Sequence, residues 1–244
     1  MPAAIPTYVR GLDDLLGGGI PEGNLVLVTG TPGAMKTSLV FSILFNNALH
    51  DRKSLFISLE QGEQELVAAL STLGMSGWSE DLLYVLDAAM LRAELGELEA
   101  EKNWLRAIEG MIKESVEVNQ RELLAIDSLD VLYAVGALAN PRRDLFHFFS
   151  FLRKLKLTTF LVSELTVGSR GLAKYGEDFL ADGVLLLKHH DVGETEVQLR
   201  LRCVKMRKTA HEGGYYGLGF QDGSFYVTRI ISRRQRQQTE NPLV

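Results

Sequence analysis

The sequence contains a single cysteine, Cys203, among its 244 residues. One cysteine excludes an intrachain disulfide and a cysteine-based metal cluster. The amino-terminal residues lack a positively charged segment followed by an apolar one, so no secretory signal peptide is expected. No apolar run reaches the length that crosses a bilayer. We therefore expect a cytoplasmic protein with no membrane partner.

The chain also lacks an excess of positive charge. Its 26 Lys and Arg residues are outnumbered by 31 Asp and Glu residues, which gives a formal net charge of −5 at pH 7. A dedicated nucleic-acid-binding protein usually carries a basic face, so the composition disfavours that class. Because charge can be local, DNA in a central channel stays open. Length and composition otherwise fit one α/β domain with a sizeable core.

The most informative stretch starts as an apolar run, Leu25–Val28, which suits a buried parallel strand. A glycine- and proline-containing turn follows, and apolar residues then recur at helical spacing after Lys36. Strand, glycine loop, Lys-Thr pair and helix make up the Walker A-type P-loop arrangement. The residues expected to bind nucleotide here are Gly30, Thr31, Pro32, Gly33, Ala34, Met35, Lys36, Thr37 and Ser38.

Each part of this motif has a chemical role. Backbone N–H groups wrap the phosphates, and the helix dipole favours their negative charge. Lys36 is expected to reach the β- and γ-phosphates, and the Thr37 hydroxyl to sit on Mg²⁺. ATP and Mg²⁺ are therefore the expected cofactors. A tight strand-to-helix turn that binds nothing is the alternative.

One position departs from the pattern G-x-x-x-x-G-K-[ST], because Met35 stands where the second glycine is expected. Glycine is typical of positions with positive φ or close approach to a ligand. A side chain in the left-handed region costs roughly 1–2 kcal/mol. We therefore expect Met35 either to reshape the loop or to take an ordinary conformation that points away from it. Either change favours slow hydrolysis.

Two further predicted strands end in carboxylates. Residues 54–59 form an apolar run followed by Glu60, and Leu123–Ile126 is followed by Asp127. In open parallel sheets, ligands bind beyond the carboxyl ends of the strands. Asp127 resembles a Walker B aspartate and is predicted to hold Mg²⁺, mostly through water. Glu60 either polarises the attacking water or is a surface residue before the next helix.

Three smaller features carry weaker signals. The cluster Gly17–Gly19 taken alone indicates a flexible connector. His147, between phenylalanines of a predicted helix, is predicted to be a packed histidine rather than a ligand. Ser163 and Glu164 follow a predicted strand, where they either sense the γ-phosphate or only make a loop polar.

The sequence also predicts the remaining elements. The predicted helices cover residues 12–16, 63–73, 95–117 and 141–156. The further predicted strands cover residues 82–86, 158–162, 184–188 and 196–204, and they are followed by a hairpin that ends near residue 227.

A late basic stretch follows the strand predicted at 196–204. It holds four groups that can carry positive charge within seven residues, and one interpretation is a solvated turn. The other is a phosphate clamp: the P-loop has its own lysine, and a second cation near a γ-phosphate often comes from another subunit as an arginine finger. The candidate residues are Lys205, Met206, Arg207 and His211.

Taken in order, these elements resemble the KaiC-like branch of the RecA-superfamily ATPases. The resemblance implies a RecA-like P-loop NTPase of class α/β: a mostly parallel central sheet flanked by helices, with a C-terminal antiparallel hairpin extension. The resemblance covers nearly all of residues 5–227, so we expect one domain over residues 1–231, and the composition of residues 232–244 predicts a basic and polar flexible tail. The stretches that carry the resemblance are Gly11-Leu12-Asp13 with Leu16–Pro21, Gly30–Ser38, Leu123–Leu129, and Lys205–Arg207 with His211.

Members of this family form ring hexamers with ATP between subunits. The resemblance therefore implies that Lys36, Thr37, Glu60 and Asp127 act within one subunit. It also implies that Lys205 and Arg207 reach the γ-phosphate of the neighbouring subunit, with His211 near the same nucleotide. The chain departs from the family at Met35, and at Gln61, where a second glutamate is usual.

The sequence thus predicts a Mg²⁺-dependent ATPase completed at the interfaces of a homohexamer, with a regulatory or signalling role. Two alternatives remain. One is a nucleotide-binding scaffold with little turnover, motivated by Met35, in which ATP holds the ring together or recruits an unidentified protein partner. The other is a DNA-handling motor similar to recombinases and helicases. The predicted catalytic residues are Glu60, Lys36, Lys205 and Arg207, and the predicted metal ligands are Thr37 and Asp127.

Overall fold

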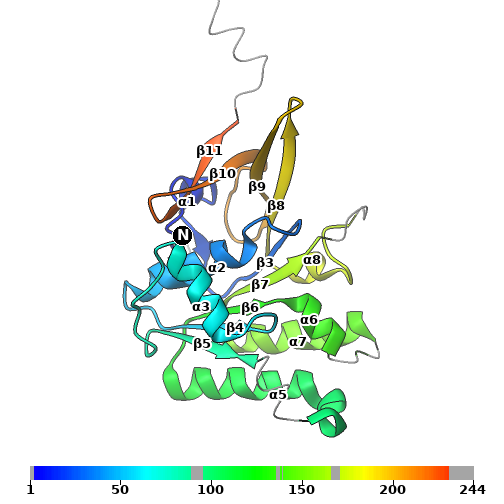
Figure 1. The fold of residues 1–244 in the computed structure, drawn as a ribbon. Coiled ribbons are helices and arrows are strands. Elements are labelled where there is room, and N and C mark those ends of the chain that lie inside the picture. Colours follow the sequence, from blue (N-terminus) through cyan, green and yellow to red (C-terminus); the bar gives the residue numbers. More distant parts are fainter. Residues whose placement is uncertain (1–2, 89–95, 136–137, 139, 166–170, 231–244) are drawn as a thin grey trace, which may run out of the picture.

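The apolar runs pair into one nine-stranded sheet with the order β11-β10-β9-β8-β3-β7-β6-β4-β5. The computed structural model describes residues 3–88, 96–135, 138, 140–165 and 171–230, so the predicted tail 232–244 lies outside the described residues. Figure 1 shows the sheet running through the molecule, with helices on both of its faces. The strands are β3 (Leu25–Gly30), β4 (Ser54–Ser58), β5 (Leu83–Asp87), β6 (Leu123–Asp127), β7 (Thr158–Glu164), β8 (Gly183–Val192), β9 (Glu196–Met206), β10 (Tyr215–Gln221) and β11 (Ser224–Arg229).

Six neighbouring strands, from β8 to β5, are parallel, and β9, β10 and β11 are added to them in antiparallel fashion. The predicted α/β class, with a mostly parallel sheet and an antiparallel C-terminal extension, is confirmed. A separate two-stranded sheet pairs β1 (Ala4–Ile5) with β2 (Ile20–Pro21). The helices are α1 (Leu12–Leu15), α2 (Lys36–Ala48), α3 (Glu63–Thr72), α5 (Gly96–Asn119), α6 (Leu129–Val135), α7 (Pro141–Leu155) and α8 (Glu177–Leu180).

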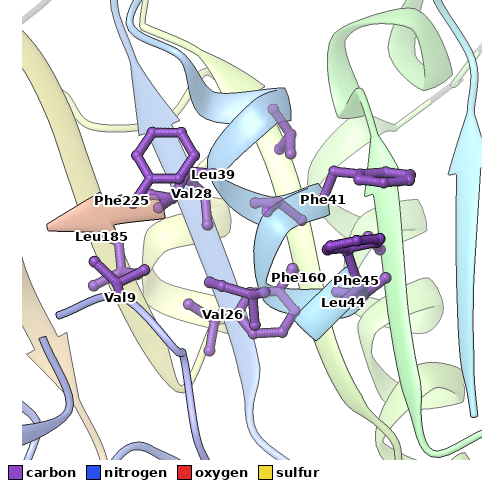
Figure 2. Packing of buried hydrophobic residues seen from close by; sticks show 14 of the residues in the cluster. Val9, Val26, Val28, Leu39, Phe41, Leu44, Phe45, Phe160, Leu185 and Phe225 are labelled. Atoms are coloured by element: carbon purple, nitrogen blue, oxygen red, sulfur yellow. The ribbon is translucent and has the colours of Figure 1, made fainter. Parts of the chain in front are cut away.

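Strand β3 is buried on both faces, which explains its continuous apolar sequence. Successive side chains of a strand point to opposite faces. Val26 and Val28 accordingly pack with α1, α2 and α3, whereas Leu25 and Leu27 pack with α5, α6 and α7. Figure 2 shows the first of these clusters, in which side chains of α2 lie against the sheet. No helix in the described ranges is long and apolar enough to span a membrane.

The prediction that His147 is packed is wrong. Helix α7 buries Leu145, Phe148, Phe149 and Leu152, which share one face at helical spacing. His147 lies outside that stripe, on the exposed side of the helix. Its ring contacts Phe146, whose residue surface is 53% exposed.

The interpretation of Gly17–Gly19 as a flexible connector is also wrong. All three glycines have positive φ. A Cβ added to Gly17 would lie 2.6 Å from the Thr209 hydroxyl oxygen, and one added to Gly19 would lie 2.5 Å from the Ile5 carbonyl oxygen. Gly17 and Gly19 therefore belong to a turn that packs closely against the segment after β9 and against the amino-terminal segment.

The burial of the core predicts that two phenylalanines differ strongly in how much they contribute to the free energy of unfolding. Phe160 of β7 is fully buried in the cluster of Figure 2, whereas Phe146 is exposed. Phe160→Ala is expected to lower the free energy of unfolding by about 3–5 kcal/mol, because it removes buried area and leaves a cavity. Phe146→Ala is expected to change it by less than about 0.5 kcal/mol. Urea unfolding measures both, and equal effects would contradict the placement of β7.

Candidate functional site

The loop after β3 turns the chain from the sheet into α2. Gly30 ends the strand where a Cβ would lie 2.1 Å from the Leu187 carbonyl oxygen of β8, so only glycine fits there. Gly33 has φ +75°, and no atom lies within 4 Å of the position that its Cβ would take. The loop leads directly into a helix of 13 residues. The first N–H groups of a helix have no partner within it, so they form an anion-binding end.

Met35 takes neither of the two conformations expected from the sequence. Its φ of 58° and ψ of 28° are left-handed, so the backbone turns as the missing glycine would. The Met35 side chain is half-buried and packs against the cluster that joins α2 to the sheet. Packing of a flexible apolar side chain offsets a conformational strain of roughly 1–2 kcal/mol. The backbone at position 35 therefore keeps the left-handed conformation that is typical of glycine, despite the substitution.

Lys36 is held by protein groups in this structure. Its Nζ donates to Oε1 of Glu164 at 2.6 Å and to the carbonyl oxygens of Gly30 and Thr31 at 3.2 and 3.1 Å. Its side chain is only 5% exposed. Glu164 is the last residue of β7, and its N–H donates to Asp130 of α6 at 2.6 Å. The ammonium group thus points toward the carboxyl ends of the strands, where it already has a negative partner.

Asp127 and Glu60 meet Lys36 at the same edge of the sheet. Asp127 ends β6 in register with Ser58 of β4, and Glu60 follows two residues after Ser58. Ser128 donates its hydroxyl proton to Glu60. Burial raises the pKa of Asp127 to about 6, although a hydrogen bond from the Thr37 hydroxyl opposes the shift. A buried carboxylate that resists ionisation is a fitting partner for a cation.

These groups line a cavity of about 310 Å³. It brings together most of the predicted site and adds Glu164, for which the sequence left two interpretations open. Hydroxyl and carboxylate oxygens are the ligands that Mg²⁺ prefers, and the end of α2 suits phosphates, so the residues present fit a magnesium nucleotide. The lining residues are Gly33, Ala34, Met35, Lys36, Thr37, Ser38, Glu60, Asp127, Val162 and Glu164.

Lys205 and Arg207 lie elsewhere. Met206 pairs with Gly183, which pairs with Val26 near the start of β3. The P-loop begins at the other end of this six-residue strand, and six residues span roughly 16 Å. Neither cation belongs to the cavity of its own chain. They mark the opposite edge of the sheet.

Alternation along β9 separates the residues of the basic stretch. Lys205 Nζ donates to the Asp178 carbonyl oxygen at 2.8 Å, and burial together with the charge of Arg207 lowers the pKa of Lys205. Met206 points the other way and is buried, with its sulfur 3.7 Å from the Asn24 amide nitrogen. The Met206 side chain is therefore a core group. His211 lies half-buried in the segment between β9 and β10.

Sequence reasoning missed several residues that shape these two edges. Ser128 directly follows Asp127, and Asp130 comes two residues later, so the motif could have indicated them. His189 contacts the Thr31 hydroxyl oxygen at 3.2 Å, and Asp182 contacts Arg207 at 3.1 Å. The latter two contacts depend on the pairing of β8 with β3 and β9, which no local pattern shows.

The comparisons with known proteins agree with this geometry. A family model described as "ATPase: KaiC" matches residues 5–229. The chain belongs to the KaiC ATPase family. It is 28% identical over 250 residues to the circadian clock oscillator protein KaiC of Acaryochloris marina, a match that covers 98% of this chain and 47% of that protein. The corresponding protein of Synechococcus elongatus is 27% identical over 248 residues, with 98% and 47% covered.

The chain thus spans about half the length of these KaiC relatives. A solved structure of a KaiC-like protein from Pyrococcus horikoshii OT3 superposes with a TM-score of 0.78 at 24% identity, covering 94% of this chain and all of that one. This likeness confirms the predicted RecA-like fold, and the family match confirms the resemblance inferred from the motifs. The KaiC family suggests ATP binding and hydrolysis for this chain.

The raised pKa of Asp127 predicts that this carboxylate destabilises the protein without ligand. Its folded-state pKa of about 6 lies above the ordinary value of 3.8. Its contribution to the free energy of unfolding is therefore intact below about pH 4 and is lost as pH rises through about 6. Asp127→Asn removes this ionisation, so it is expected to stabilise the metal-free protein by on the order of 2–3 kcal/mol near pH 7.5 and by well under about 1 kcal/mol near pH 4.

Urea unfolding across this pH range measures the difference between Asp127→Asn and the unaltered protein. Asp81→Asn is the matched control, because the Asp81 side chain is 72% exposed and pairs with Lys53 on the surface. Its effect is expected to stay within about 0.5 kcal/mol at every pH. A destabilised Asp127→Asn variant at neutral pH would contradict the assignment.

Proposed function

We propose that this KaiC-family protein is a Mg²⁺-dependent ATPase whose active site is completed by a neighbouring copy of the same chain. The observation that carries the proposal is the position of Lys205 and Arg207 at the amino ends of the strands, one strand length away from the loop 30–38. Cations so placed cannot serve the phosphates of their own chain. They can serve those of a neighbour docked head to tail.

Within one chain, the residues divide the work of phosphoryl transfer. The first N–H groups of α2 and the Lys36 ammonium bind the phosphates. Glu60 orients a water molecule for attack on the γ-phosphorus and accepts its proton. When bound, Mg²⁺ would supply positive charge at the β- and γ-phosphates, held by Thr37 and Asp127. The neighbour's Lys205 and Arg207 neutralise the negative charge that develops during transfer.

The head-to-tail contact also sets the kind of assembly. One edge of the sheet carries the nucleotide site and the opposite edge carries the cations, so the two surfaces of an interface differ. Such heterologous interfaces generate closed rings when the rotation between copies closes. A ring of six copies is the assembly that we propose, in a regulatory or signalling role.

A slow enzyme, or a nucleotide-binding regulator with little turnover, is supported by the contacts inside the cavity. Lys36 is paired with Glu164, and Glu60 is engaged by Ser128. When phosphate binds, it must replace Glu164 as the partner of Lys36. When Glu60 orients a water molecule, that water must replace Ser128 as its partner. The first exchange lowers the affinity for nucleotide, and the second raises the barrier to turnover.

Mg²⁺-dependent phosphate release from ATP tests the proposal, with Glu60→Gln and Arg207→Ala as the variants. Each is expected to retain binding of a fluorescent ATP analogue within about threefold, because neither removes a phosphate ligand of its own subunit. Loss of an arginine finger lowers turnover on the order of 10³-fold or more. Unaltered turnover in Arg207→Ala would refute the role of Arg207.

Mixing the two inactive variants tests completion by a neighbour. A mixed oligomer contains interfaces where an intact Glu60 on one copy meets an intact Arg207 on the next. At random equal mixing these are about one quarter of all interfaces, so about a quarter of the normal activity should return. Absence of recovery, with both variants assembled as the unaltered protein is, would place Arg207 in the site of its own chain.

The variant Met35→Gly tests whether the rate of ATP hydrolysis is limited by the loop 30–38 or by the contacts inside the cavity. Since the Met35 backbone already occupies the left-handed region, glycine would follow the same course. The rate of phosphate release is therefore expected to change by less than about threefold. A gain of about tenfold or more would show that Met35 itself limits the enzyme.

A further inference from the structure

Asp182 occupies the junction between β3 and β9, directly before β8. Its N–H donates to the Leu25 carbonyl oxygen at 2.7 Å, and its own carbonyl oxygen accepts from the Arg207 N–H at 2.9 Å. The residue surface is only 8% exposed. The backbone of Asp182 is thus tied both to the strand that leads into the P-loop and to the segment that carries Arg207.

The two carboxylate oxygens of Asp182 have separate partners. Oδ2 accepts from the Leu25 N–H at 3.2 Å, and Oδ1 accepts from an Arg207 guanidinium nitrogen at 3.1 Å. The first bond anchors the carboxylate to the edge of the sheet. The second therefore connects an anchored acceptor to a side chain that is 52% exposed.

The surroundings of Asp182 are strongly cationic. A guanidinium nitrogen of Arg153 lies 3.5 Å from Oδ1, and the charges of Arg207 and Arg153 both disfavour the protonated form of Lys205. At this edge Asp182 lines a cavity of about 540 Å³ together with Glu22 and three basic residues, Arg153, Lys156 and Lys208. The buried Asp182 carboxylate thus offsets part of the mutual repulsion of the cations that are grouped here.

We infer that Asp182 is a positioning residue for Arg207: its anchored carboxylate aims the guanidinium toward the nucleotide of the neighbouring copy. The inference rests on the proposed function, since it needs Arg207 to act on a neighbour. An arginine has many rotamers, and holding it before the encounter removes the entropy loss of ordering it during the reaction. Salt bridges to a buried, fixed acceptor also persist better than exposed pairs.

Asp182→Asn separates the two bonds. Its single side-chain oxygen can still accept from the Leu25 N–H, which places the amide N–H₂ group toward Arg207. A donor then faces a donor, so the anchor to β3 remains while the contact with Arg207 is lost. The expected result is a fall in kcat of about tenfold or more, with KM for ATP within about twofold.

Two measurements exclude a merely structural effect. In an Arg207→Ala background, Asp182→Asn should change kcat by less than about twofold, because the two residues act as a unit. Mixing Asp182→Asn with Glu60→Gln should restore activity, since the Glu60→Gln copies supply an intact Arg207. If Asp182 acted on its own P-loop through β3, mixing would restore nothing, and that result would overturn the inference.

Glu122→Gln is the matched control. Glu122 accepts from Arg52 at 3.0 Å, an Arg–carboxylate pair that also lies before the start of a parallel strand but is exposed, and neither residue belongs to the proposed machinery. Its kcat should stay within about twofold. Light scattering and thermal unfolding verify that each variant assembles and folds as the unaltered protein does.

The remaining outcomes distinguish failure of the positioning role of Asp182 from failure of the proposed ATPase function. If Arg207→Ala is slow but Asp182→Asn is not, the positioning role is wrong and the ATPase proposal stands. If Arg207→Ala is unimpaired, the proposed completion by a neighbour fails first. A faster Asp182→Asn variant would mean that Asp182 withholds Arg207 instead of aiming it, which also overturns the inference.

Discussion

The pairing of β3 on both sides is the constraint on which the rest of the structure depends. Its register with β8 places Gly30 against the Leu187 carbonyl group at one end. At the other end, the same pairing places Leu25 against Asp182. A shift of one residue would exchange the two faces of the strand and would break both contacts. The close approach of Gly30 to Leu187 and the contact of Leu25 with Asp182 therefore fix the positions of the P-loop and of Arg207 together.

Much of the fold and half of the candidate site could be predicted from local sequence. Apolar runs of strand length indicated the parallel sheet, and the Lys36-Thr37 pair after a glycine turn indicated the nucleotide loop. Asp127 was predictable because an apolar strand delivers its last residue to the ligand-binding edge. In each case the function of a residue follows from its place in one continuous segment.

The remaining features depend on contacts between distant segments. The left-handed backbone of Met35 is accompanied by packing of its side chain against the core. The preference for glycine at such positions does not predict this packing. The pair formed by Lys36 and Glu164 joins residues 128 positions apart. The pair formed by Asp182 and Arg207 depends on the register of the three strands β3, β8 and β9. His147 was misjudged for a simpler reason: neighbouring phenylalanines in the sequence do not share its face of the helix.

The charges of the cavity explain why this edge of the sheet suits a magnesium nucleotide. Three acidic side chains, of Asp127, Glu60 and Glu164, line the cavity with Lys36. Adding phosphates alone would bring more negative charge to the Asp127 carboxylate, whose pKa is already raised mainly by burial and further by the charges of Glu60 and Glu164. A divalent cation that arrives with the phosphates reverses this balance, because each negative group then faces positive charge.

The same reasoning applies to the charges on the two surfaces of the proposed interface. In the part of the chain that the structure describes, the edge that carries Lys205, Arg207 and Arg153 has an excess of basic groups, and the buried Asp182 carboxylate lies among them. Two edges with opposite excess charge on one rigid sheet favour head-to-tail contact over contact between like edges.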